Sequence, residues 1–481
     1  MTKTKRFLAL LLTVVMLCTG SMSVSAATTS AEAWSNYWKT ADEEIGAAVM
    51  LTPGSDDSER YVSWYSESES GSVVLLDSNG KKLDEITASA NKTHQDDYRL
   101  CAVIDSLEDG KTYGYYCKSG DWTSETYTFT TIDGDSFTAM YLTDIHITGE
   151  DYHEDGIRDN AYNLNLTLET GLAKARAQGK NIDLLLSAGD QGSDGRRDEY
   201  TGLVASPLVR SIPFATTVGN HDKKGADYRY FTHQPNTADM NIRSYVGTDY
   251  WFVKGDVLFL IMDSNNTSMT DHRRFVKKAV KANEDVKWRV AMFHHDLYSA
   301  RIESRESENA LLRLMWAPIA DEFGIDLCLL GHSHYYTISN VLYNNKTVEA
   351  TENGGKVTDA EGTVYMVSGS VNRPRDDEDV GLSENIGHAY LTQEKIYNLI
   401  DFSEDSIVIN SYTVESDENI GSLTIEKTTN EGGHNYRTIG RLYYPLVSVI
   451  GFIANIFTNI GDAYDNRQQG FKIPFFEGLF G

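Results

Sequence analysis

Five near-continuous apolar segments in the middle of the chain each run directly into a short group of Asp, Asn or His residues. Ligands of open α/β sheets bind in the crevice outside the carboxyl ends of the strands. We therefore expect a fold in which the five groups meet at one place. In chain order the groups are Asp144-Ile145-His146, Gly189-Asp190, Gly219-Asn220-His221-Asp222, His294-His295 and Gly331-His332-Ser333-His334.

Strand and helix patterns alternate between residues 135 and 428. The clearest helix is 157–178, with apolar residues on one face and Gly179 to end it. Segments 271–282 and 306–323 are also helical, and Pro318 could break the last one. Such alternation with buried strands predicts a layered α/β domain. The expected strands are 138–142, 182–186, 214–217, 257–262, 289–293 and 325–330, with a second sheet built from 363–367, 396–401, 406–412 and 422–426.

Residues 45–132 have an all-β pattern and follow an acidic, helix-prone lead at 27–44. Short β-rich segments recur there, separated by turn pairs such as Pro53-Gly54 and Asn79-Gly80. Their spacing predicts a β-sandwich, and Leu107, Gly110 and Tyr113 have the spacing of a tyrosine corner.

The first 26 residues have the pattern of a secretory signal peptide. A basic start precedes the apolar stretch Phe7–Leu17, and the segment ends in the small residues Val24-Ser25-Ala26. The apolar stretch is too short to span a bilayer comfortably. We therefore expect cleavage after Ala26 and a secreted or cell-surface protein.

Removal of the signal leaves three cysteines. Cys101 and Cys117 lie in neighbouring β segments and could form a disulfide in an oxidising compartment or stay as separate buried thiols. Cys328 lies in an apolar segment and is expected to be a core thiol.

The charge of the chain restricts its partners. The net charge is −27 over 481 residues and becomes −30 without the signal, which carries three basic residues and no acidic one. Such a surface repels polyanions. Binding to nucleic-acid polymers or anionic lipids is therefore not expected.

The five groups together have the composition of a two-metal site. A single Asp, Asn or His in a loop is more often a cap, a turn residue or a core residue than a ligand. Seven oxygen and nitrogen ligands with one shared carboxylate, however, are what two cations require. Their joint occurrence after five strands predicts a binuclear metal centre.

The order and spelling of these groups resemble a known family. DIH, GD, GNHD, HH and GHSH resemble the five-block signature of the calcineurin-like metallophosphoesterase superfamily. The segments LTPGSDDSERYVSWYS, LEDGKTYGYYCKSGDWTSETYTFTT and WRVAMFHHDLYS resemble purple acid phosphatases. The resemblance covers about residues 45–428. It implies a four-layer αββα metallophosphoesterase domain at 135–428 behind a fibronectin-III-like sandwich at 45–132.

The resemblance also implies which residues bind which metal ion. One ion would be held by Asp144, His146, Asp190 and His334. The other would be held by Asp190, Asn220, His294 and His332. Asp190 would bridge the two cations, whose mutual repulsion its charge offsets.

Two positions depart from purple acid phosphatases. The tyrosine that ligates ferric iron in that family is replaced by Ser193, and the first block ends in His146 where the family has Gly. Imidazole and carboxylate ligands without thiolate or phenolate suit Zn, Mn or Fe, as two divalent or mixed-valence ions. We expect a colourless protein.

The chemistry implied by the resemblance is phosphate-ester hydrolysis. Two cations activate a bound water, giving a hydroxide that attacks phosphorus. His221 would act as general acid on the leaving oxygen, and Asp222 would orient its imidazole. His295 would face the substrate and stabilise charge, or it would be a histidine that supports the ligands or lies at the surface.

Residues 429–481 form a separate tail. Its segment 442–461 is uncharged, with an apolar helical stripe at 446, 450, 453, 457 and 460. Three outcomes are open: a helix packed on the protein, an interfacial or partner-binding helix, or a membrane span.

Three functions therefore remain open. The first is a secreted phosphatase acting on small phosphate monoesters. The second is a phosphodiesterase, because the DIH spelling also occurs in diesterases of the superfamily. The third is a non-catalytic surface-binding protein with a vestigial site.

Overall fold

The computed structural model describes residues 47–148, 156–241, 246–298, 306–375, 383–429 and 436–465, with backbone only at 156–159, 306–308 and 455–465. The expected signal peptide and the lead at 27–44 lie outside these residues.

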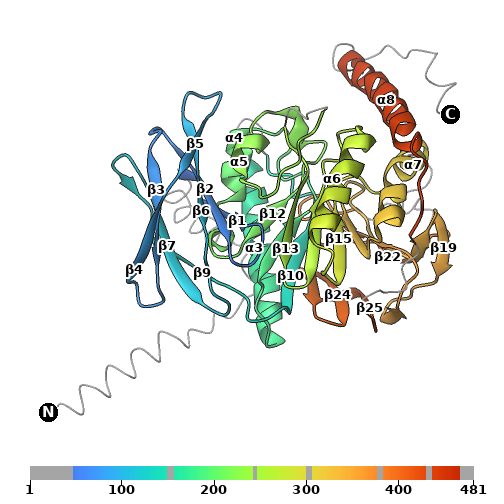
Figure 1. Ribbon diagram of the computed structural model, residues 1–481, viewed down its shortest axis with the longest axis horizontal. Helices are drawn as coiled ribbons and strands as arrows, with labels where there is room; N and C mark the ends of the chain where they lie inside the picture. Colours follow the sequence, from blue (N-terminus) through green and yellow to red (C-terminus); the bar gives the residue numbers. More distant parts are fainter. Residues whose placement is uncertain are drawn as a thin grey trace, which may run out of the picture. The chain divides into compact units, whose positions relative to one another are not determined.

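Two packed antiparallel sheets form the N-terminal part of the described chain (Figure 1, blue). One has the order β1-β2-β6-β5, and the other has the order β4-β3-β7-β8 with β9 also paired to β7. Trp64, Leu100 and Tyr115 are fully buried between them. The strands are β1 (Met50–Pro53), β2 (Arg60–Ser66), β3 (Gly71–Leu76), β4 (Lys82–Thr87), β5 (Ser89–Lys92), β6 (Tyr98–Ile104), β7 (Thr112–Ser119), β8 (Trp122–Thr123) and β9 (Tyr127–Thr130).

The structure of this sandwich tests two expectations from the sequence, the tyrosine corner and the state of the cysteines. The hydroxyl of Tyr113 accepts a hydrogen bond from the backbone N–H of Glu108 at 2.9 Å, as a tyrosine corner requires. Cys101 on β6 and Cys117 on β7 are separate, buried free thiols, and so is Cys328. Burial raises the pKa of Cys101 to about 11, so its thiol is protonated at neutral pH.

Two seven-stranded mixed sheets form the core of the second part. One has the order β12-β11-β10-β23-β24-β25-β20, and the other has the order β13-β14-β15-β16-β21-β17-β22. A large apolar cluster that includes Tyr141, Leu186, Phe259 and Val290 fills the space between them. The strands of the first sheet are β10 (Phe137–Leu142), β11 (Leu184–Ser187), β12 (Phe214–Thr216), β20 (Gly355–Thr358), β23 (Ile396–Phe402), β24 (Ser406–Thr413) and β25 (Asn419–Glu426). Those of the second are β13 (Tyr250–Lys254), β14 (Val257–Ile261), β15 (Trp288–Met292), β16 (Leu327–Leu330), β17 (Tyr336–Ser339), β21 (Val364–Ser368) and β22 (Ile386–Tyr390), while β18 (Val341–Tyr343) and β19 (Lys346–Glu349) pair as a separate hairpin.

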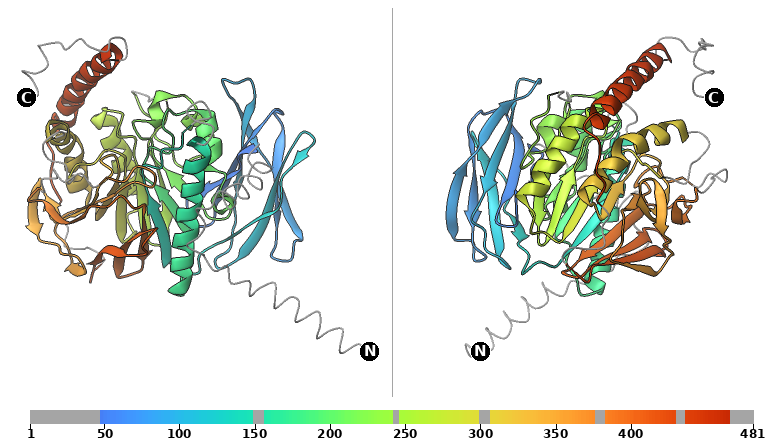
Figure 2. Two further views of the ribbon diagram at one scale, coloured as in Figure 1. Left: turned by 180° about the vertical axis from the view of Figure 1, so that it is seen from behind. Right: turned by 45° about the vertical axis from the view of Figure 1, so that its right-hand side comes forward.

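Helices cover the outer faces of both sheets (Figure 2). Helix α3 (Gly156–Ala177) lies on the first sheet against β23, and α6 (Met269–Ala282) and α7 (Glu306–Phe323) cover the second. Helix α7 continues through Pro318 without a break. The predicted four-layer αββα arrangement is therefore confirmed.

Hydrogen bonds join the sandwich to the second part through two short helices, α4 (Arg197–Leu203) and α5 (Tyr228–Phe231). The wholly buried Arg99 donates to the carbonyl oxygen of Phe231 at 2.7 Å. Arg197 at the start of α4 forms an ion pair with Asp97. The sandwich thus holds in place the helices that lie behind the third ligand group.

The tail forms helix α8 (Tyr443–Asp465), which packs on α6 and α7 (Figure 1, red). Among its described side chains, Tyr443, Tyr444, Val447 and Ser448 contact the protein, whereas the described part of the stripe expected from the sequence does not. Where the side chains of that stripe are described, they are exposed: Leu446 and Ile453 are 60% and 48% accessible. Helix α8 is apolar on nearly every side, so the surface of α6 and α7 selected its packed face. Of the helices that are described, none is both long and apolar enough to cross a bilayer.

Candidate metal centre

The predicted ligand groups meet because the strands before them are parallel neighbours. β10, β11 and β12 pair in parallel, which places Asp144, Asp190 and Asn220 at one edge of the first sheet. β15 and β16 pair in parallel in the second sheet and deliver His294 and His332 to the same crevice.

The first set of ligand atoms surrounds one point. His334 Nε2 lies 3.2 Å from Asp144 Oδ1 and 3.1 Å from His146 Nε2. His146 Nε2 lies 3.7 Å from Asp190 Oδ2. Asp144, His146, Asp190 and His334 are all buried.

The second set surrounds an adjacent point. His294 Nε2 lies 3.3 Å from Asp190 Oδ2 and 3.0 Å from Asn220 Oδ1. His332 Nδ1 lies 2.8 Å from the same Asn220 oxygen and 3.3 Å from His294 Nε2. Asp190 Oδ2 therefore belongs to both sets, while Asp190 Oδ1 accepts the backbone N–H of His221 at 2.7 Å.

These distances fit two cations. Four tetrahedral ligands at about 2.1 Å from a cation lie about 3.4 Å from one another. Asp144 Oδ1 is buried and accepts no hydrogen bond from the described residues. This oxygen is therefore available to bind a cation. His294 Nδ1 donates to the carbonyl oxygen of Ala188 and His334 Nδ1 to that of Arg373, which leaves Nε2 of each ring for a metal.

The backbone of this crevice is held in conformations that side chains rarely adopt. Five of the seven predicted ligands have positive φ: Asp144, His146, Asp190, His332 and His334, with values between 51° and 75°. Residues in this region cost about 1–3 kcal/mol each and cluster at functional sites.

Glycines in the ligand groups are required by close approach. A Cβ atom on Gly219 would lie 2.0 Å from Asp190 Oδ1, and one on Gly331 would lie 2.1 Å from Thr143 Oγ1. Because no side chain fits at these two positions, sterics require glycine directly before Asn220 and His332.

Charges in the crevice are strongly coupled. Burial opposes the charge of Asp190, but His294 and His146 hold the pKa of its carboxyl well below its usual range. Burial lowers the pKa of His294, but the carboxylates of Asp190 and Asp144 raise it to about 9. Burial lowers the pKa of His146 and keeps that ring neutral, as a metal ligand must be.

His221 lies beside the first set, with its ring centroid 4.7 Å from that of His146. Its Nδ1 donates to the carbonyl oxygen of Ser193 at 2.7 Å, and Lys224 Nζ donates to the same oxygen at 3.0 Å. Burial lowers the pKa of His221. A backbone carbonyl therefore orients this imidazole.

The expected role of Asp222 as the orienting group is wrong. Its carboxylate accepts the backbone N–H groups of Gln191, Gly192 and Gly219 and the hydroxyl of Tyr200. Burial and the nearby charge of Asp190 raise the pKa of Asp222 to about 7. Asp222 joins the second and third ligand loops, and sequence adjacency to His221 gave no indication of this.

His295 lies beside the second set. Its ring centroid is 4.6 Å from that of His332, and its Nδ1 lies 2.8 Å from Ser264 Oγ. The two predicted non-ligand histidines thus flank opposite halves of the centre.

Three polar residues of the crevice, Ser193, Lys224 and Arg373, lie outside the predicted site. The sequence offers Arg373 only as one of several arginines that could contact phosphate, and a solvated surface position is more frequent for such a residue. Ser193 was noted only for the tyrosine that it replaces. Arg373 donates to Ser193 Oγ at 3.2 Å, and Lys224 contacts the carbonyl of Ser193. Arginine and lysine on a loop resemble surface residues in sequence, so no local pattern indicated Lys224 or distinguished Arg373 from the other loop arginines.

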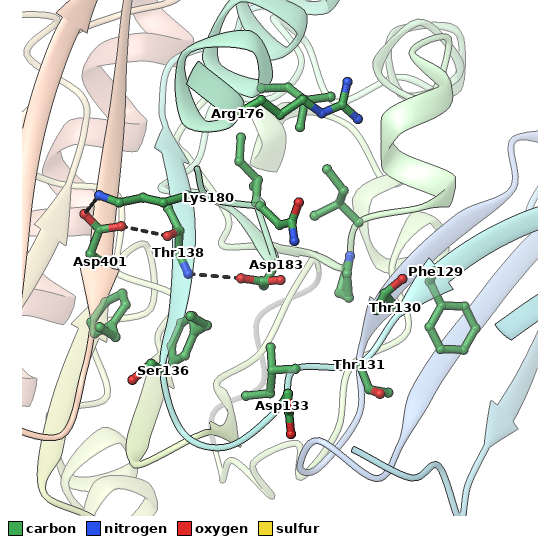
Figure 3. A pocket seen from close by; sticks show the side chains of 18 of the residues that line it. Phe129, Thr130, Thr131, Asp133, Ser136, Thr138, Arg176, Lys180, Asp183 and Asp401 are labelled. Atoms are coloured by element: carbon green, nitrogen blue, oxygen red, sulfur yellow. Dashed lines mark hydrogen bonds and ion pairs between the residues drawn. The ribbon is translucent and has the colours of Figure 1, made fainter. Parts of the chain in front are cut away.

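A cavity of about 940 Å³ lies at the opposite, amino ends of β10, β11 and β12 (Figure 3). Several of its polar groups are paired with one another: Lys180 with Asp401, Asp401 with the Thr138 hydroxyl, and Asp183 with the Thr138 N–H. This cavity lacks the converging ligand atoms of the metal centre.

Two family models match parts of the sequence. Residues 137–336 match the family model of the calcineurin-like phosphoesterases, and residues 47–131 match that of the purple acid phosphatase N-terminal domain. No curated protein matches the sequence.

Two solved structures share the fold. The purple acid phosphatase PPD1 from yellow lupin (Lupinus luteus) seeds has a TM-score of 0.66 at 13% identity, over 82% of this chain and 77% of that chain. PhoD has a TM-score of 0.53 at 12% identity, over 86% of this chain and 99% of that chain. The chain therefore joins a segment that matches the N-terminal domain of purple acid phosphatases to a segment that matches the calcineurin-like phosphoesterases, and it shares the fold of PPD1 and PhoD.

Proposed function

We propose that the protein is a secreted, metal-dependent phosphatase that hydrolyses small phosphate monoesters. The observation that carries this proposal is the convergence of two sets of ligand atoms on the shared oxygen Asp190 Oδ2. The acidic surface supports small substrates over polyanions.

The residues can hold two metal ions, with Asp144, His146 and His334 on one side of Asp190 and Asn220, His294 and His332 on the other. Such ions would supply an activated water and offset the charge of the phosphoryl oxygens. Imidazole, amide and carboxylate ligands fit Zn, Mn or Fe.

The other histidines would act on the substrate. His221, with Nδ1 held by Ser193, presents its other nitrogen beside the first set and would protonate the leaving oxygen. His295, held by Ser264, would stabilise charge beside the second set.

Chelation and metal replacement test this proposal. The protein is stripped of metal, reloaded with Mn, Zn or Fe(II), and assayed with p-nitrophenyl phosphate and bis-p-nitrophenyl phosphate. We expect about two bound ions per chain and faster turnover of the monoester. No turnover with any of the metals would contradict it.

A phosphodiesterase is the second candidate, because His146 completes the first set in place of the family's glycine. Faster turnover of the diester in the same assay would favour this candidate. A chain without tightly bound metal and without activity would favour a non-catalytic binding protein.

Secretion and membrane contact are further parts of the proposal. Residues 1–26 would direct export, and N-terminal sequencing of the exported protein should begin at Ala27. Leu442, just before α8, and the exposed side chains of Leu446 and Phe452 on α8 would contact a lipid surface. Flotation with phosphatidylcholine vesicles, with and without residues 441–481, tests this contact.

A further inference from the structure

Arg373 lies on the loop that follows β21, and hydrogen bonds tie this loop to the first ligand group. Ser370 Oγ donates to the carbonyl oxygen of Asp144 at 2.7 Å and accepts the Arg373 N–H at 2.9 Å. Asn372 Nδ2 donates to the carbonyl oxygen of Ile145 at 2.7 Å. The carbonyl oxygen of Arg373 in turn accepts Nδ1–H of His334 at 2.8 Å. The backbone of Arg373 is therefore fixed beside the first set.

The guanidinium group of Arg373 retains donors for a ligand. One nitrogen, Nη2, donates to Ser193 Oγ at 3.2 Å. The residue is exposed, and within the described part of the chain it forms no ion pair. A guanidinium carries five N–H donors, so a single neutral contact leaves most of them available.

Ser193 makes room for this arrangement. Purple acid phosphatases carry a tyrosine at the corresponding position, whereas a serine hydroxyl is small and can accept the guanidinium hydrogen bond. The carbonyl of Ser193 also holds His221 and Lys224. Two cationic side chains thus lie around His221 in a protein of net charge −27. Of these two, only Lys224 forms an ion pair with a described carboxylate, that of Asp194 at 3.4 Å.

Phosphate monoesters and diesters differ in the charge and in the number of non-bridging oxygens that a guanidinium group can bind. A monoester carries nearly two negative charges and three non-bridging oxygens at neutral pH. A diester carries one charge and two such oxygens. Arginine binds phosphate oxygens through two parallel N–H donors, which lysine cannot reproduce.

We propose that the Arg373 guanidinium binds a non-bridging oxygen of the substrate phosphoryl group and selects monoesters over diesters. This inference rests on the proposed phosphatase function. Ser193 holds the guanidinium in position until the phosphoryl group replaces or extends that contact.

The test compares Arg373→Ala and Arg373→Lys with Arg375→Ala, a control two residues further along the same loop. Metal content is measured first, followed by kcat/KM for p-nitrophenyl phosphate and bis-p-nitrophenyl phosphate. Calorimetry then gives the affinity of the metal-loaded protein for inorganic phosphate, independently of turnover.

Arg373→Ala should lower kcat/KM for the monoester by about 10- to 100-fold and weaken phosphate binding by a similar factor. The diester should lose less than about threefold, Arg373→Lys should fall between, and Arg375→Ala should match the wild type. Equal losses for both esters, or unchanged phosphate affinity at unchanged metal content, would overturn the assignment. If the wild type hydrolyses neither ester, the proposed function fails, while phosphate calorimetry still decides whether Arg373 binds phosphate.

Discussion

Strand β11 has a carboxylate at each end, and the two ends differ in how their polar groups are paired. Asp183 at the amino end faces the cavity of about 940 Å³, where it accepts the Thr138 N–H at 3.1 Å. Asp190 at the carboxyl end faces His146 and His294, whose ring nitrogens approach it at 3.7 and 3.3 Å.

The two ends differ in the convergence of ligand atoms, and this convergence, rather than cavity size, is why we propose the carboxyl end as the functional one. At the amino end, the Lys180 ammonium and the Thr138 hydroxyl both donate to the Asp401 carboxylate. At the carboxyl end ring nitrogens face one another, as His146 and His334 do at 3.1 Å. Such contacts are favourable when a cation lies between the atoms.

The largest expected effect is the difference between substitutions of the two carboxylates that flank β11. Asp190→Asn should remove metal and lower phosphatase activity by at least about 1000-fold, because both sets of ligands lose their shared oxygen. Asp183→Asn, the matched change at the other end, should keep activity within about twofold. Metal analysis and kcat/KM measure both, and equal losses would show that the two ends are not functionally distinct.

His221→Ala should have the next largest effect and should depend on the leaving group. Loss of a general acid costs about 100- to 10,000-fold with an alkyl phosphate, whose leaving oxygen needs a proton. The loss should be much smaller with p-nitrophenyl phosphate, and metal content should not change. A loss independent of the leaving group would remove the acid role.

Asp222 tests whether the loops at the carboxyl end depend on a buried carboxylate. Asp222→Ala leaves three backbone N–H groups and the Tyr200 hydroxyl without their acceptor. We expect a loss of about 2–4 kcal/mol in the free energy of unfolding, against about 1 kcal/mol for Tyr200→Phe, which removes one donor. Urea denaturation measures both, and equal losses would contradict the network.

The smallest expected effect is a change in how the unfolding free energy depends on pH, caused by Asp183 at the amino end of β11. Burial raises the pKa of Asp183. A raised pKa in the folded state adds stability at low pH that is lost as pH rises from about 4 through the folded pKa. Asp183→Asn should therefore reduce the decline in unfolding free energy between pH 4 and 7, measured in chelator so that metal release does not contribute. An unchanged decline would show that Asp183 does not titrate abnormally.

Much of the fold followed from local pattern. The helix expected at 157–178 is α3 at Gly156–Ala177, and that expected at 306–323 is α7. Short edge elements such as β19, whose residues are all exposed, carry no apolar pattern and were not predicted. The packed face of α8 could not be predicted either, since apolar residues surround most of that helix.

Local patterns in the chain are enough to predict which residue types follow which strands and in which order, and they include the glycines before Asp190, Asn220 and His332. Strand and helix periodicities are local, and so are these spacings. The tertiary structure decided that Asp190 Oδ2 belongs to both ligand sets, that Ser193 and not Asp222 holds His221, and that Arg373 reaches Ser193. These contacts join loops up to 180 residues apart. They depend on how two sheets pack, which no local pattern records.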